Sequence, residues 1–78
     1  MSKQKMQEIF DSYTIETWYS KNDMAYLAQI QELPDCITDG KTRMEAIEEL
    51  ELVFEGWLEI ALEDGIAIPA ANKYGNVA

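Results

Sequence analysis

The sequence contains no histidine, one cysteine (Cys36), and only six lysine and arginine residues against fifteen aspartate and glutamate residues. Without histidine, the chain has no imidazole for acid–base catalysis, for metal ligation or for a serine-type triad. A single cysteine excludes a disulfide within the chain. The formal net charge of −9 argues against a surface that binds nucleic acid phosphates or anionic membranes, and it favours a basic partner.

Long hydrophobic runs are missing as well. No apolar stretch approaches the roughly 20 residues of a membrane helix, and no charged-then-apolar leader opens the chain. The composition is nevertheless 47% hydrophobic, which is too apolar for a disordered chain. A chain of 78 residues has room for one small domain of marginal stability. We therefore expect a soluble, cytoplasmic protein that associates with itself.

A long helix is the clearest element that the sequence predicts. Thr42 and Glu45 have the spacing of a capping box, in which the Thr42 side chain accepts from the Glu45 backbone amide and the Glu45 side chain reaches back to Thr42. Gly65 supplies the left-handed residue that ends a helix. Between these signals, apolar residues recur every three or four positions, as on a helix that lies on a core. The predicted core positions are Ile47, Leu50, Phe54, Trp57, Leu58 and Ala61.

The other elements are shorter. We expect a helix or arm over residues 1–12, a domain over residues 13–69 and a tail over residues 70–78. Strands are predicted at Tyr13–Tyr19, Ala25–Gln31, Cys36–Thr38 and Ile66–Ile68, with a sharp corner at Leu33–Cys36. The predicted fold class is α+β, with the order β-β-β-α-β. The simplest arrangement places one amphipathic helix on one face of a small sheet containing antiparallel strands.

Two groups of residues resemble ligand-binding sites, one for phosphate and one for a cation, but ordinary turn and helix-start residues explain both more simply. Asp35–Thr42 resembles a phosphate-binding loop, but Asp35 stands at its first glycine position and would oppose a phosphate. Glu32, Asp35 and Asp39 could hold a hard cation and serve a metal hydrolase, yet their spacing matches no calcium loop. Solvated turn residues explain them more simply. We predict no catalytic, cofactor or metal site and no enzyme activity.

The predicted helix is strongly acidic. From Thr42 to Gly65 it has eight acidic residues and one basic residue, which gives −7 of the net −9. Glutamates recur every four residues from Glu51 to Glu63, where like charges destabilise a helix by about 0.2–0.5 kcal/mol per pair. The row is either a solvated face or a docking surface for a basic protein. Leu52, an apolar residue among these carboxylates, favours docking. The candidate partner-binding residues are Glu48, Leu52, Glu55 and Glu59.

A second apolar row flanks the predicted core face. Ala46, Val53 and Ile60 recur every seven residues, and if they are exposed they indicate an oligomer contact. Gly56 lies in the middle of the helix, where glycine costs about 1 kcal/mol relative to alanine. It indicates either the close approach of another backbone or a tolerated accident.

An ordered set of motifs resembles the HicB family of antitoxin-like proteins. The resemblance covers about Tyr13 to Pro69 and is carried by Tyr26–Cys36, Asp39–Thr42, Glu45–Ile47, Trp57–Leu58 and Gly65–Pro69. It departs from the family pattern at Asp35, where the family usually has glycine, and at Lys41, where it usually has aspartate. The departures imply a corner without the freedom of glycine and a positive charge at the helix start, which the helix dipole disfavours.

The resemblance implies a partly degenerate RNase H-like fold without catalytic carboxylates. It also implies binding to a small basic HicA-type toxin that cleaves mRNA, and assembly into dimers or larger oligomers. Many family members carry a separate DNA-binding domain, and we expect residues 70–78 to be too few for one. The alternative is a homo-oligomeric module that has no toxin.

Overall fold

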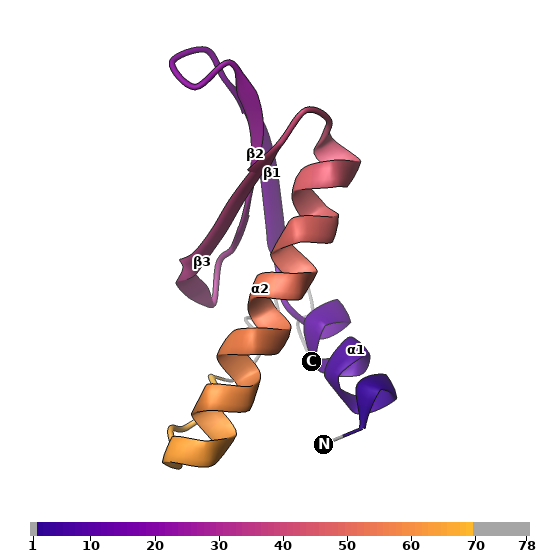
Figure 1. Ribbon diagram of the computed structural model, residues 1–78, viewed down its shortest axis with the longest axis vertical. Coiled ribbons are helices and arrows are strands. Elements are labelled where there is room, and N and C mark those ends of the chain that lie inside the picture. Colours follow the sequence, from indigo (N-terminus) through magenta and orange to yellow (C-terminus); the bar gives the residue numbers. More distant parts are fainter. Residues whose placement is uncertain (1, 70–78) are drawn as a thin grey trace, which may run out of the picture.

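The computed structural model describes residues 2–69, and the predicted tail at residues 70–78 lies outside them. The chain forms a short helix, three strands and a long helix (Figure 1). These elements are α1 (Lys3–Ser12), β1 (Ile15–Ser20), β2 (Ala25–Ile30), β3 (Leu33–Gly40) and α2 (Arg43–Asp64). The strands form one antiparallel sheet in the order β1-β2-β3, and α2 lies across one face of it. The predicted α+β class is confirmed.

The face of the sheet that packs against α2 follows the alternation of β2. Ala28 and Ile30 are fully buried, and Tyr26 lies on the same face. In the register of β1 with β2, Thr17 pairs with Ala28, so alternate residues of both strands share this face. At the hairpin end, the rings of Tyr19 and Tyr26 meet edge to face with their centroids 5.1 Å apart.

Strand β3 is longer than predicted. The turn falls at Gln31–Glu32, and the predicted corner at Leu33–Cys36 is wrong because these residues belong to β3. A register shift at Gln29/Ile30 accommodates Pro34, which cannot donate a ladder hydrogen bond. The Gln29 amide Nε2 donates to the Pro34 carbonyl at 2.9 Å.

The ends of α2 lie where the sequence predicts them. The Thr42 hydroxyl accepts from the Glu45 amide at 3.0 Å, and Gly65 ends the helix with φ of 70°. The return bond of the capping box differs from the prediction, because the Glu45 carboxylate accepts from the Lys41 amide at 3.3 Å. The backbone amides of Lys41, before the cap residue, and of Glu45, after it, therefore both have side-chain acceptors.

Gly40 allows β3 to run directly into α2. A Cβ atom on Gly40 would lie 2.7 Å from the Ala46 backbone nitrogen, so only glycine fits without a backbone shift. The hydroxyl of Thr38 donates to the Ala46 carbonyl at 2.7 Å and ties the strand to the first turns of the helix.

The core is centred on Phe54. Its ring centroid lies 5.6 Å from that of Phe10, 5.8 Å from that of Tyr13 and 6.3 Å from that of Trp57. Burying such a side chain contributes about 1.5–3 kcal/mol. Because Phe10 of α1 is part of this cluster, α1 belongs to the domain core. The residues of α2 that are buried are Ala46, Leu50, Phe54, Leu58 and Ala61, and Ile47 and Trp57 are partly buried.

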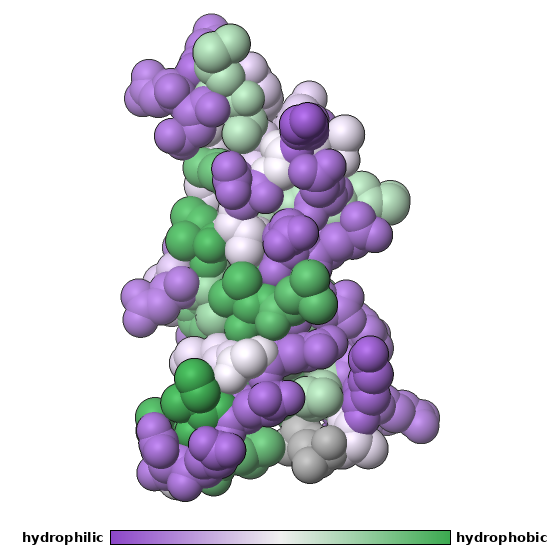
Figure 2. Space-filling view, viewed as in Figure 1, coloured by the Kyte–Doolittle hydropathy of each residue, from purple (hydrophilic) through white to green (hydrophobic). Residues whose placement is uncertain are grey.

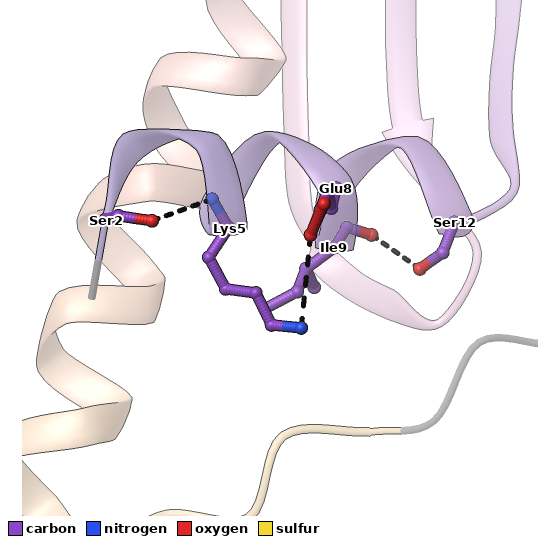
Figure 3. A network of polar contacts seen from close by, with 5 residues as sticks. All are labelled: Ser2, Lys5, Glu8, Ile9 and Ser12. Carbon is purple, nitrogen blue, oxygen red and sulfur yellow. Dashed lines mark hydrogen bonds and ion pairs between the residues drawn. The ribbon is translucent and has the colours of Figure 1, made fainter.

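Local contacts define α1 (Figure 3). At its start, the Ser2 hydroxyl accepts from the Lys5 amide at 3.1 Å, and at its end the Ser12 hydroxyl donates to the Ile9 carbonyl at 2.6 Å. The first amides and the last carbonyls of a helix have no main-chain partner within it. The two serine hydroxyls bond to one such group at each end of α1.

The predicted fourth strand at Ile66–Ile68 is wrong, because residues 66–69 form neither strand nor helix. The Ile66 amide donates to the Ala61 carbonyl at 2.8 Å, which folds the chain back on the helix end. The Tyr13 hydroxyl then donates to the Pro69 carbonyl at 2.7 Å, and Ile68 packs against the core. Side-chain contacts therefore hold this segment in place of a ladder.

In the part of the chain that the structure describes, neither helix combines the length and the apolar character needed to cross a membrane.

Candidate partner-binding surface

The outer side of α2 carries carboxylates that pair with no lysine or arginine of residues 2–69. Glu48 and Glu59 are exposed, and Glu55 is half-buried. Among residues 2–69, the single ion pair joins Lys5 and Glu8 of α1, with 4.0 Å between nitrogen and oxygen (Figure 3). No carboxylate of α2 is therefore neutralised by a lysine or arginine of the described residues.

The one basic residue of α2 points elsewhere. The guanidinium carbon of Arg43 lies 4.9 Å from the centroid of the Tyr26 ring, in a cation–π contact with the sheet. On a helical wheel Arg43 shares the side of Leu50 and Phe54, away from Glu55 and Glu59. The positive charge consequently contributes little to balancing the acidic side.

Four large aliphatic residues of α2 are exposed, and three of them lie close together, whereas Leu62 lies on the other flank of the helix. Leu52 is 62% exposed, Val53 is 42% exposed and Ile60 is 57% exposed. Figure 2 shows hydrophobic residues gathered among hydrophilic ones over the middle of α2. Ala46, predicted to share the oligomer contact with Val53 and Ile60, is 0% exposed and packs in the core, so it cannot contribute to a surface. Its small side chain lies where β3 and α2 approach most closely.

Helix geometry joins the two predicted surfaces into one. Leu52, Gly56 and Ile60 lie one turn apart along α2, and Val53 lies beside them. We call Leu52, Val53, Gly56 and Ile60 the apolar strip. A Cβ atom added to Gly56 would meet no heavy atom of residues 2–69 within 4 Å apart from the adjoining helix backbone, so the strip has an open gap at its centre. The sequence alone assigned Leu52 to one surface and Val53 with Ile60 to another.

A hollow of about 470 Å³ lies beyond the N-terminal end of the strip. Asp39 of β3 and Glu45 and Glu49 of α2 contribute carboxylates to its lining, and Lys41 contributes one positive charge. Glu49 lies one turn before Val53, so the hollow and the strip adjoin. No residue pattern predicted this hollow, because it depends on how β3 and α2 are placed.

The acidic residues near the β2–β3 turn do not form a metal centre. Residues 2–69 contain no group of three histidine, cysteine, aspartate or glutamate side chains placed to hold a metal ion. The Glu32 carboxylate instead accepts from the Thr14 amide at 2.9 Å and from the Thr14 hydroxyl at 3.4 Å. Glu32 therefore fastens the start of β1 to the β2–β3 turn.

The segment that resembles a phosphate-binding loop is not a loop in the structure. Most of it belongs to β3, which extends to Gly40, and α2 begins at Arg43. An extended strand does not turn its successive amides towards one bound phosphate. This geometry agrees with reading Asp39–Thr42 as a helix start.

Two buried groups have perturbed acidity, and both lie on the core side. Burial raises the pKa of the Tyr13 hydroxyl, and the negative charge of Glu32, with that of the Cys36 thiolate once it forms, raises this pKa further. Burial also raises the pKa of the Cys36 thiol, with a further contribution from Asp35. A thiol with a raised pKa holds less of the reactive thiolate. Neither group belongs to the exposed surface of α2.

Comparison with known proteins identifies a family. The chain matches the UPF0150-like family over residues 14–69, which is more than two thirds of its 78 residues. No curated protein and no solved structure matches it. The matched range contains all three strands and the whole of α2, including the acidic side and the apolar strip. The chain belongs to the UPF0150-like family.

Proposed function

We propose that this protein is a HicB-like antitoxin-type protein of the cytoplasm, which binds a small basic HicA-type mRNA-cleaving toxin and neutralises it by protein contact. It acts as a binding protein and not as an enzyme. The single observation that carries the proposal is the outer side of α2, where the carboxylates have no cationic partner among residues 2–69 and Leu52 is 62% exposed.

The family supports this assignment. The UPF0150-like family is related to HicB and to toxin–antitoxin proteins. The structure also has the three strands followed by a helix that the HicB resemblance implies, without the final strand of that order.

The physical mechanism would be electrostatic capture followed by local contact. Complementary charge speeds the encounter of two proteins and disfavours acidic competitors. Glu48, Glu55 and Glu59 would attract the basic protein, and Leu52 would supply a desolvated contact within the charged field. A toxin held in this way would have its basic RNA-binding surface covered.

The test is co-expression with the product of the neighbouring reading frame. The proposal expects a small basic protein to co-purify with this chain at low salt and to dissociate as salt increases, because salt screens exposed charge pairs. If the neighbouring product is not basic, or if it does not bind, toxin neutralisation is rejected.

A homo-oligomeric module without a toxin is the second candidate, favoured by the exposure of Val53 and Ile60. In this case Val53→Glu should reduce the mass measured by light scattering, because a buried carboxylate opposes association. An unchanged mass would remove Val53 from any subunit contact.

A further inference from the structure

We propose that the apolar strip receives one helix of a basic partner protein, which crosses α2 at Gly56 and places a large apolar side chain against the exposed glycine backbone. This inference rests on the proposed function, because the occupant is the basic partner described there. Beyond that function, it specifies that the partner binds through a helix, that this helix crosses α2 at Gly56, and that its contacting face is apolar.

Among residues 2–69, nothing requires glycine at position 56. Gly40 is needed because a Cβ would strike the Ala46 backbone, and Gly65 is needed because its φ is 70°. Gly56 has neither reason, since its φ is not positive and a Cβ there would meet no heavy atom within 4 Å. Alanine is the better residue at an exposed position inside a helix. A contact with a partner protein would account for the glycine, because residues 2–69 supply none that uses it.

The second step is the shape around the gap. Leu52 and Ile60 lie one turn before and one turn after Gly56, so the three form a ridge with its middle side chain missing. Such a gap lets a second helix approach more closely and takes one side chain from it, which is how small residues act at other helix contacts. Val53 forms one wall of the gap. An extended peptide would make less use of this shape, because α2 offers it no unpaired main-chain groups.

The third step is the charge that surrounds the strip. Glu49, Glu59 and Glu63 border it on the helix surface, and the hollow next to it adds Asp39 and Glu45. A second copy of this chain would bring the same carboxylates to the contact, and like charges would oppose each other. A helix with lysine or arginine on both sides of an apolar stripe complements both the apolar strip and the carboxylates around it. Its cationic end would reach the hollow lined by Asp39, Glu45 and Glu49.

The experiment uses the full chain and a synthetic probe. The probe is a labelled helical peptide of about 18 residues, or five turns, with leucine along one stripe and lysine elsewhere. A peptide of the same composition with its leucines dispersed is the control. Binding is followed by fluorescence anisotropy at low salt. We expect the striped peptide to bind about tenfold more tightly than the dispersed one.

The decisive variants act on the gap itself. Gly56→Leu should weaken binding of the striped peptide about tenfold, because a side chain fills the gap. Gly56→Ala should also weaken binding, although it should raise the melting temperature by about 4–8 °C through helix propensity. Loss of binding in a more stable protein cannot result from misfolding. Ile60→Ala should weaken binding of the striped peptide, whereas Leu62→Ala, which removes an exposed side chain about 120° around α2 from Gly56, should not.

Two results would overturn the inference. One is equal affinity of the striped peptide for the original chain and for Gly56→Leu. The other is a dimer of the original chain that Gly56→Leu dissociates, which would make a second copy the occupant. If the neighbouring toxin binds Gly56→Leu normally but responds to changes at Glu55 and Glu59, the proposed function stands and only the helix contact is rejected.

Discussion

The hydroxyl group of Tyr13 donates a 2.7 Å hydrogen bond to the carbonyl oxygen of Pro69, 56 residues further along the chain. The same ring packs edge-on against Phe54, with the centroids 5.8 Å apart. Tyr13 thus joins the segment before β1, the centre of α2 and the segment after α2. This contact holds residues 66–69 against the domain although they form no strand.

Tyr13→Phe should test that connection, because it removes the hydroxyl and keeps the ring. The loss of one partly buried hydrogen bond, with the Pro69 carbonyl left unpaired, should lower the free energy of unfolding by about 0.5–1.5 kcal/mol. Urea denaturation measures the change. Tyr19→Phe, on a ring that is exposed at the hairpin, is the matched control and should have little effect. Equal effects of the two substitutions would show that the Pro69 contact does not stabilise the fold.

Thr42→Ala should destabilise the whole domain, because α2 supplies much of the core. Removal of the N-cap hydroxyl leaves the Glu45 amide without its 3.0 Å acceptor and should cost about 1 kcal/mol. Thr42→Ser, which keeps the hydroxyl, should recover most of this loss in the same thermal denaturation experiment. A Thr42→Ser protein as unstable as Thr42→Ala would mean that the methyl group, and not the cap, is responsible.

Stability should decline in alkaline solution. Cys36 and Tyr13 are neutral when protonated, and both pKa values are raised in the folded chain above their ordinary 9.0 and 10.0. The folded state therefore keeps protons at a pH at which the unfolded state releases them. The contribution of these two groups to the free energy of unfolding is complete at a pH below their ordinary pKa values. It is lost as the pH rises through their pKa values in the folded chain.

Urea midpoints measured from neutral to alkaline pH test this decline. Cys36→Ala removes one of the two groups, so it should make the first part of the decline shallower, although the smaller side chain lowers stability at every pH. The comparison is between slopes and not between absolute stabilities. A slope that Cys36→Ala leaves unaltered would show that the thiol does not contribute.

Glu59→Gln should stabilise the isolated protein. Glu59 lies one turn from both Glu55 and Glu63, and removing its charge relieves two repulsions of about 0.2–0.5 kcal/mol each. Added salt should stabilise the original chain for the same reason and should stabilise Glu59→Gln less. Glu8→Gln is the control, because Glu8 lies beside Lys5 and its loss should not stabilise the chain. A lower melting temperature for Glu59→Gln would show that this carboxylate has a favourable partner.

The parts of the fold that depend on local chemistry could be predicted from the sequence. The helix from Thr42 to Gly65 was predictable because both end signals act within one turn, and its apolar spacing gave the buried stripe around Phe54. The hairpin of β1 and β2 was predictable from β-branched and aromatic residues separated by turn formers.

The predictions that were wrong concern segments whose structure depends on contacts between residues far apart in the sequence. Pro34 indicated a corner, but a register shift lets β3 include it. Ile66–Ile68 has the composition of a strand, yet the Ala61 carbonyl and the Tyr13 hydroxyl hold the segment in another way. Ala46 has the spacing of Val53 and Ile60, but the approach of Gly40 buries it. The hollow beside the strip depends on the same placement and had no sequence signal.

We propose that the acidic side of α2 captures a basic protein. The most direct test is a calorimetric titration of the purified neighbouring basic protein into the original chain and into a Glu55→Lys/Glu59→Lys variant, each at low and high salt. We expect the original chain to bind tightly and to lose affinity as salt rises, and the variant to bind more weakly with a smaller dependence on salt. If the variant keeps the affinity and the salt dependence of the original chain, the acidic side of α2 is not the binding surface.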